Sequence, residues 1–201
     1  VFGTRAAEHI ASLGNATTPA QSDIRASAEQ AIGQIEALLK PDSPLNGQIV
    51  RDHVQTRMSD KAGIICTRFE VAQALAEARA LNAEIRAKGI AYDRATEVTR
   101  VIQRHHMALA SEAVLTALDF YIGQGGGSRG ARAICDEAGE SVPQIAGGTL
   151  ENYRFRNEKL AHKAEQIVVR LIDAVMQIST RPNRAFDEAA KPFFERDWPD
   201  W

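Results

Sequence analysis

The sequence TRFEVAQALAEARALNAEIRAKG, residues 67–89, decides the fold class. Thr67 and Glu70 have the spacing of a capping box, in which each side chain bonds the other residue's backbone N–H. Apolar residues then recur every three or four positions, as on one buried face of a helix. They are Val71, Leu75, Ala78, Leu81 and Ile85. Lys88 and Gly89 are typical helix-ending residues. This stretch therefore predicts a well-defined amphipathic helix.

The first two helical patterns lie near the start of the chain. Residues 1–14 fit a helix that ends at Gly14, since glycine is a common residue after a helix C-terminus. Thr18 and Gln21, with Pro19 between them, predict a second capping box and the start of another helix. That helix is expected to stop at Lys40, before a proline.

Two further helices complete the predicted bundle. One restarts at Ser43–Pro44 and breaks near Gly63. The longest runs from Tyr92 to Ile122, with one continuous stripe along it. The stripe consists of Val98, Ile102, His106, Leu109, Ala113, Ala117 and Phe120. Long helices joined by short connections indicate a mainly α protein, an antiparallel bundle of about four or five helices.

The glycine-rich run at residues 123–130 ends this pattern, because each glycine costs roughly 1 kcal/mol in a helix relative to alanine. The run follows a helix instead of a strand and lacks the lysine of a phosphate-binding loop. It therefore predicts a turn that lets the chain double back over the bundle.

The tail after the turn is less regular. Residues 165–180 fit two structures: β-branched residues favour a hairpin turning at Asp173–Ala174, while a helical face also matches the apolar spacing. The hairpin is the favoured alternative. The chain closes with an aromatic cluster, which we expect to dock on its own protein or on a partner. Its residues are Phe193, Phe194, Trp198 and Trp201.

Composition limits the function classes. The chain has 201 residues, which suits one domain or one domain with an appendage. A net charge of −2 does not provide the basic surface of a nucleic-acid-binding protein. No apolar run approaches the roughly 20 residues of a membrane-spanning helix. Cys66 and Cys135 form no C-x-x-C pair, so we expect reduced thiols in a cytoplasmic protein.

Two motifs contain side chains capable of chemistry. His105 and His106 are adjacent on a helix and point about 100° apart, so they do not predict a metal site. His106 is expected in the core or an interface. Ser128, Arg129 and Arg132 lie at the glycine-rich corner, where an arginine could contact an anion or another domain. The favoured alternative for Arg129 is a structural pair with a helix C-terminus or a nearby carboxylate.

Three segments, in this order, carry a resemblance: VFGTRAA at residues 1–7, MSDKAGIICT at 58–67, and SRGA at 128–131. They look like the V-F-G-R-x-A-G helix, the G-I-V-R-T segment and the E-S-R-G-A-H corner of the succinate dehydrogenase and fumarate reductase flavoprotein family, whose relatives include L-aspartate oxidase. The resemblance covers roughly residues 1–132. Beyond it, only the aromatic ending is loosely similar.

Three positions depart from the family pattern. Gly127 stands in place of Glu, Arg132 where His is common, and Cys66 in place of Arg. These departures argue against succinate dehydrogenase or respiratory fumarate reductase itself, and favour another member of the family.

The resemblance implies a parent protein that binds FAD and transfers hydride to or from a small carboxylate-bearing substrate. The dinucleotide fingerprint and the substrate-binding His and Arg residues would lie before Val1, which has no capping residue ahead of it. No residue of this chain maps to them. We therefore expect no catalytic or cofactor-binding residue here, and a chain that is inert alone.

The implied organisation has three parts. Residues 1–14 would be the last helix of the missing flavin-binding domain, 15–122 the bundle, and 123–201 the glycine-rich turn and aromatic tail. The upstream flavin-binding domain is the expected partner, with a homo-oligomer or an electron-transfer subunit as further candidates. The rival hypothesis is a stand-alone helical adaptor or regulatory domain. An exposed apolar surface on the first helix would favour the first hypothesis, and a sealed bundle the second.

Overall fold

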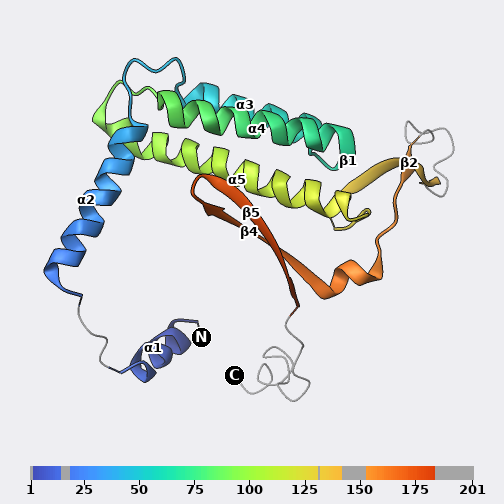
Figure 1. Cartoon of the computed structure of the whole chain (residues 1–201), viewed down its shortest axis with the longest axis horizontal. Helices are drawn as coiled ribbons and strands as arrows, with labels where there is room; N and C mark the ends of the chain where they lie inside the picture. Colours follow the sequence, from blue (N-terminus) through green and yellow to red (C-terminus); the bar gives the residue numbers. More distant parts are fainter. Residues whose placement is uncertain (1, 15–18, 131, 142–152, 184–201) are drawn as a thin grey trace.

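The computed structural model describes residues 2–14, 19–130, 132–141 and 153–183 (Figure 1). Five α-helices account for most of these residues. They are α1 (Phe2–Ser12), α2 (Gln21–Leu38), α3 (Gly47–Lys61), α4 (Arg68–Lys88) and α5 (Val98–Gly123). The predicted mainly α class is confirmed. The aromatic cluster at the chain end lies outside the described residues.

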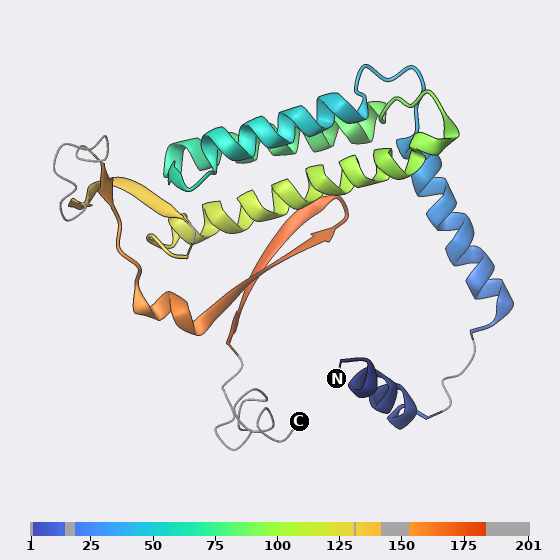
Figure 2. The same cartoon turned by 180° about the vertical axis from the view of Figure 1, so that it is seen from behind.

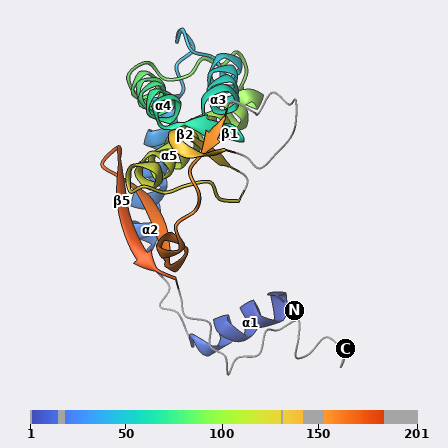
Figure 3. The ribbon, with the colours of Figure 1, turned by 90° about the vertical axis from the view of Figure 1, so that its right-hand side faces the viewer.

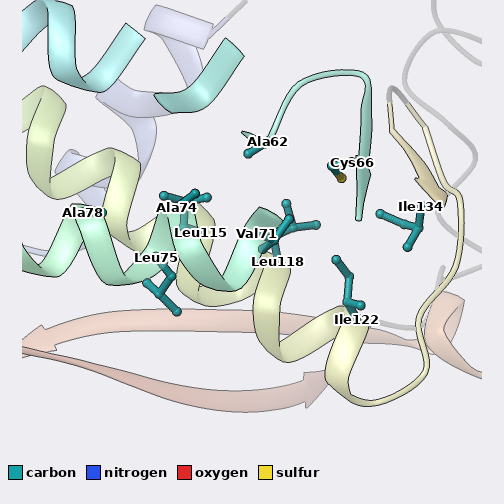
Figure 4. Close-up of a cluster of buried hydrophobic side chains, with 10 residues drawn as sticks. All are labelled: Ala62, Cys66, Val71, Ala74, Leu75, Ala78, Leu115, Leu118, Ile122 and Ile134. Carbon is teal, nitrogen blue, oxygen red and sulfur yellow. The ribbon is translucent and has the colours of Figure 1, made fainter. Parts of the chain in front are cut away.

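Helices α3, α4 and α5 form the bundle, and each runs opposite to the one before it (Figures 1 and 2). Two buried clusters hold them together. The first joins all three helices through Val50, Val54, Leu81, Ile85, Val101 and Ala108. The second lies toward the strand-bearing end and contains Val71, Leu75, Leu115, Ile122 and Ile134 (Figure 4).

The capping box of α4 is confirmed. The Thr67 hydroxyl accepts a hydrogen bond from the Glu70 N–H at 3.2 Å, and the Glu70 carboxylate accepts one from the Thr67 N–H at 2.8 Å. The helix ends at Gly89, whose φ of +68° favours glycine. A Cβ there would also lie 2.7 Å from the Leu38 carbonyl oxygen, so glycine is required twice over.

Two predicted helix starts are wrong. Helix α2 begins at Gln21, with Ala20 at the N-cap and no capping side chain, so Gln21 does not complete a capping box. The predicted cap, Thr18, lies outside the described residues. Helix α3 begins at Gly47, where Asn46 caps it by accepting from two backbone N–H groups at 2.9 and 3.0 Å. The hydroxyl of Ser43 instead donates to the Gly89 carbonyl at 2.8 Å.

The start and the buried face of α5 also differ from expectation. The helix begins at Val98, after a 3₁₀ turn, η1 (Ala95–Glu97), instead of at Tyr92. His106, expected in the core or in an interface, is exposed within this chain, so its placement in the core is wrong. The buried residues are Val101, Ala108, Ser111, Glu112, Leu115, Thr116, Leu118 and Ile122. Three of these buried residues are polar, so they do not appear in the apolar spacing. The apolar spacing therefore predicted a neighbouring face of the helix as the buried one.

That neighbouring face of α5 has a partner of its own. Phe120, from the predicted stripe, lines a cavity of about 340 Å³ together with Ile167 and Thr180. These two residues belong to β4 (Glu165–Ile172) and β5 (Val175–Pro182), which form an antiparallel hairpin. Helix α5 therefore packs against helices on one side and against the hairpin on the other (Figures 1 and 3).

The hairpin prediction is confirmed, including its turn. Asp173 and Ala174 have φ of +49° and +63°, the two positive values that a type I′ turn requires. A 3₁₀ turn, η2 (Leu160–Ala164), precedes the hairpin.

A small second sheet was not predicted. Its order is β1 (Ile65–Thr67), β2 (Ala133–Ser141) and β3 (Arg154–Phe155). Strand β1 runs parallel to β2, with Cys66 opposite Ile134, and both of these side chains are buried. The sheet joins the loop before α4 to the chain that leaves the glycine-rich corner.

Helix α1 stands apart from the bundle, and α2 reaches it only at its C-terminal end, where Leu38 packs against the first buried cluster (Figures 1 and 3). Helix α2 has no buried residue. The side chains described in α1 are all exposed. Among the described helices, none has both the length and the apolar character needed to cross a membrane.

Candidate functional site

The glycine-rich corner follows α5 and packs against its own chain. Gly125 and Gly130 have positive φ values, +82° and +59°, which let the backbone reverse. A Cβ at Gly127 would lie 2.0 Å from the Asn157 carbonyl oxygen. This close approach explains why a glycine stands at position 127. It also means that this backbone is covered by residues 156–157 and does not form an open phosphate cradle.

Ser128 holds the corner to the small sheet. Its hydroxyl accepts a hydrogen bond from the Ile134 N–H at 3.0 Å, and its own N–H donates to the Arg156 carbonyl at 2.7 Å. Both polar groups of Ser128 are therefore engaged within the chain.

Arg129 points the other way, toward η2. Its Nε lies 3.0 Å from a carboxylate oxygen of Glu158, and an Nη donates to the His162 carbonyl at 3.2 Å. Glu158 also pairs with Lys163 at 3.1 Å. This is the structural pair with a nearby carboxylate that the sequence favours for Arg129. The Arg129 side chain is still 46% exposed.

Arg132 contacts a third segment. Its Nε donates to the Ala62 carbonyl, at 3.2 Å, in the loop after α3. Burial raises the pKa of the nearby Cys66 thiol, and the positive charge of Arg132 opposes that rise. The backbones of Arg129 and Arg132 bond each other, at 3.0 and 3.1 Å, but the side chains of Ser128, Arg129 and Arg132 bond to three different segments and do not converge on one point. Their role in binding an anion or another domain stays a prediction.

Sequence reasoning missed the ion pair between Arg156 and Asp136. Arg156 also donates to the Ile122 carbonyl at 3.3 Å, where it complements the C-terminus of α5. The pKa of Asp136 is lowered, first by the hydrogen bond from the Ala138 N–H and then by Arg156. No local motif marks this pair, because its residues come together only when β2 and β3 meet.

The other prominent surface is apolar. Four large side chains on the first two helices, or directly after the first, face solvent: Ile10 is 67% exposed, Leu13 66%, Ile24 53% and Ile32 53%. We call these four residues the arm face. Single exposed apolar residues are ordinary, but a run of them on consecutive helices without a buried side is typical of a docking surface.

The adjacent histidines lie at different depths on α5. His105 is half-buried, and its pKa is lowered by burial and then by the charges of His106 and Arg86. The two imidazole centroids are 6.1 Å apart. Within the described ranges, no group of three or more His, Cys, Asp or Glu side chains is placed to hold a metal ion.

Comparison with known proteins gives a fold likeness. No family model and no curated protein matches the chain. Among solved structures, it is similar to a mutant of E. coli quinol fumarate reductase FrdA, with a TM-score of 0.65 and 16% sequence identity. The similarity covers 92% of this chain but 28% of that chain. Identity this low establishes a shared fold and leaves function to be argued separately. The chain thus has the fold of a segment of that fumarate reductase chain.

Proposed function

We propose that this chain is the carboxy-terminal helical domain of an FAD-dependent oxidoreductase that resembles the succinate dehydrogenase and fumarate reductase flavoproteins. It packs against a flavin-binding domain and is not catalytic alone. The arm face carries this proposal: its four large apolar side chains, on α1, directly after it and on α2, are more than half exposed. The likeness to part of FrdA supports it.

The physical argument concerns what stabilises α2. Most helices in proteins are stable because they bury one face against the rest of the molecule. Helix α2 buries no residue in the described chain. Fully burying an isoleucine or leucine contributes roughly 1.5–3 kcal/mol, so a partner that covers the arm face gains several such contributions. A stand-alone adaptor domain whose helices covered all of their apolar faces would not expose these four side chains.

FAD itself does not fit the residues present. A dinucleotide site needs a strand, a glycine-rich turn and a helix N-terminus in succession. Here β1 leads into α4 through Thr67 without a glycine turn, and the glycine-rich run follows a helix and packs against Asn157. FAD would therefore be held by the partner domain, and so would the small carboxylate substrate.

The test uses the full-length gene product. Ile24→Asp and Ile32→Asp should weaken domain docking, measured as faster limited proteolysis within α2. Ile64→Asp is the matched control, because Ile64 is 75% exposed but lies outside the arm face. Equal proteolysis rates in all variants and the parent would contradict the docking role.

A second test concerns the cofactor. We expect the purified 201-residue chain to be colourless and the whole gene product to carry flavin, measured by visible absorption. Stoichiometric flavin on the 201-residue chain would show that the cofactor site was misplaced. An upstream sequence without a strand and G-x-G-x-x-G would favour the adaptor hypothesis.

A further inference from the structure

A groove of about 810 Å³ lies at the strand-bearing end of the bundle, far from the arm face (Figures 1 and 2). The first turn of α4 forms one wall, and β2 and β3 with the residues beside them form the other. Two aromatic side chains of its lining face solvent: Phe69 is 78% exposed and Tyr153 is 42% exposed. The Tyr153 ring stacks on Phe155, with centroids 6.2 Å apart. Exposed apolar side chains gathered in one place are typical of a docking surface.

The small sheet has an uncovered face beside this groove. Cys66 and Ile134 lie opposite each other on β1 and β2, and both are buried against the bundle. Successive side chains of a strand point to opposite faces, so Ile65 and Cys135 lie on the outer face. Ile65 is 40% exposed, and Cys135, which lines the groove, is half-buried. The outer face of the sheet therefore extends the apolar surface of the groove.

The groove also has an excess of positive charge. Arg156 is neutralised by its pair with Asp136. Within the described chain, Arg68 makes no hydrogen bond or ion pair, and Arg154 donates only to a backbone carbonyl, at 3.3 Å. Of the carboxylates that line the groove in the described chain, Glu137 alone is unpaired. The groove therefore suits an apolar segment that also contains acidic side chains.

The chain itself contains a segment of this kind. Residues 193–201 have the sequence FFERDWPDW, which we call the aromatic segment. It contains four aromatic residues, and its three acidic residues and one arginine give a net charge of −2. It lies outside the described residues. Its composition complements both the apolar surface and the charge of the groove.

The described chain also brings the start of this segment within reach of the groove. The Asn183 N–H donates to the Ala164 carbonyl at 2.7 Å, so the two residues are neighbours. Ala164 is eight residues after Arg156 of the groove, and because η2 takes up most of this stretch, they lie at most roughly 25 Å apart. The ten residues from Asn183 to Phe193 span up to about 35 Å when extended. The aromatic segment can therefore reach the groove of its own chain.

We propose that the aromatic segment docks into this groove of its own chain. Its aromatic rings pack on Phe69 and Tyr153, and its carboxylates contact Arg68 and Arg154. A tethered segment is present at a high effective concentration, which favours it over a separate partner of the same chemistry. This proposal does not depend on the redox role proposed above.

Tryptophan fluorescence tests the docking, because both tryptophans of the chain, Trp198 and Trp201, lie in the aromatic segment. Acrylamide quenching of the 201-residue chain should show them shielded. Phe69→Asp should shift the equilibrium at least about 10-fold toward exposed tryptophan, because it removes an apolar contact and spares the core. Val175→Asp is the matched control on the hairpin, where Val175 is 60% exposed, and it should leave the quenching unchanged.

The charge contacts have their own variants. Arg68→Gln should shift the same equilibrium about 3-fold, the modest effect of an exposed ion pair. Arg79→Gln, at an exposed position of α4 outside the groove, is the control and should have no effect. Unchanged quenching in Arg68→Gln would contradict the charge contact.

Three results would overturn the proposal. Exposed tryptophans in the parent chain would leave the groove to another protein or domain. Release of the tryptophans by Val175→Asp instead of Phe69→Asp would place the aromatic segment on the hairpin. Shielding that increases with protein concentration would place it on a second copy of the chain.

Discussion

The bundle of α3, α4 and α5 and the arm of α1 and α2 are both helical, but they are stabilised differently. Each bundle helix buries several side chains, among them Val50, Ile85 and Leu115. Helix α2 buries none and has no capping side chain. Both regions have apolar residues at helical spacing, so the spacing alone does not show whether a face is covered within the same chain. The bundle helices cover one another's apolar faces, whereas no part of the described chain covers the arm face.

The largest contrast should come from large-to-small substitutions. Leu115→Ala in the bundle should lower the free energy of unfolding by about 2–5 kcal/mol, because it removes a fully buried side chain and leaves a cavity. Ile32→Ala in the arm should change it by less than about 0.5 kcal/mol. Urea unfolding of the 201-residue chain measures both. Similar losses for the two variants would mean that the arm is packed in solution.

The α4 cap gives a smaller effect. Thr67→Ala should cost about 1 kcal/mol, because it removes one half of the capping box from a bundle helix. Thr99→Ala, an exposed threonine inside α5, is the control and should be nearly neutral. The same urea measurement applies, and an unchanged midpoint for Thr67→Ala would show that the cap contributes nothing to the bundle.

The hairpin turn offers a gain in stability. Ala174→Gly should stabilise the protein by up to about 1 kcal/mol, because alanine at a φ of +63° carries a cost that glycine avoids. Ala31→Gly in α2 should lower helicity instead. Thermal unfolding and circular dichroism distinguish these opposite effects. A loss of stability in Ala174→Gly would be inconsistent with the type I′ turn.

The smallest effect is a pH dependence. The folded protein holds the pKa of His105 below its ordinary value of 6.5, chiefly by burial. The unfolded chain therefore takes up the proton first, and stability should fall as pH drops below about 6.5. His105→Gln should flatten this part of the stability curve, because it removes the group whose pKa burial lowers. A curve that is unchanged in His105→Gln would assign the dependence to other groups.

Local signals predicted local structure well. The Thr67 capping box and the Asp173–Ala174 turn depend on residues close in sequence, and both are confirmed. The start of α3 was missed because Ser43–Pro44 offered a competing signal, while the actual cap is Asn46. The buried face of α5 was missed because Ser111 and Glu112 are buried through hydrogen bonds to other helices, which the apolar pattern does not record.

The candidate sites were less predictable than the fold. Arg129 was singled out from its glycine-rich context, but its ion-pair partner Glu158 carried no signal. The pair between Arg156 and Asp136 and the parallel pairing of β1 with β2 depend on segments far apart in the chain. None of these follows from spacing within one helix or strand.

Thr67 belongs to a strand and also caps a helix. It is the last residue of β1, opposite Cys135, and it is also the N-cap of α4. Closing the pair between β1 and β2 requires α4 and α5 to bring together residues 65–67 and 133–135, and such distant contacts form slowly. We therefore expect the bundle to assemble first and this strand pair last. A nascent chain that ends before residue 135 would then contain packed helices but lack the complete pairing of β1 with β2.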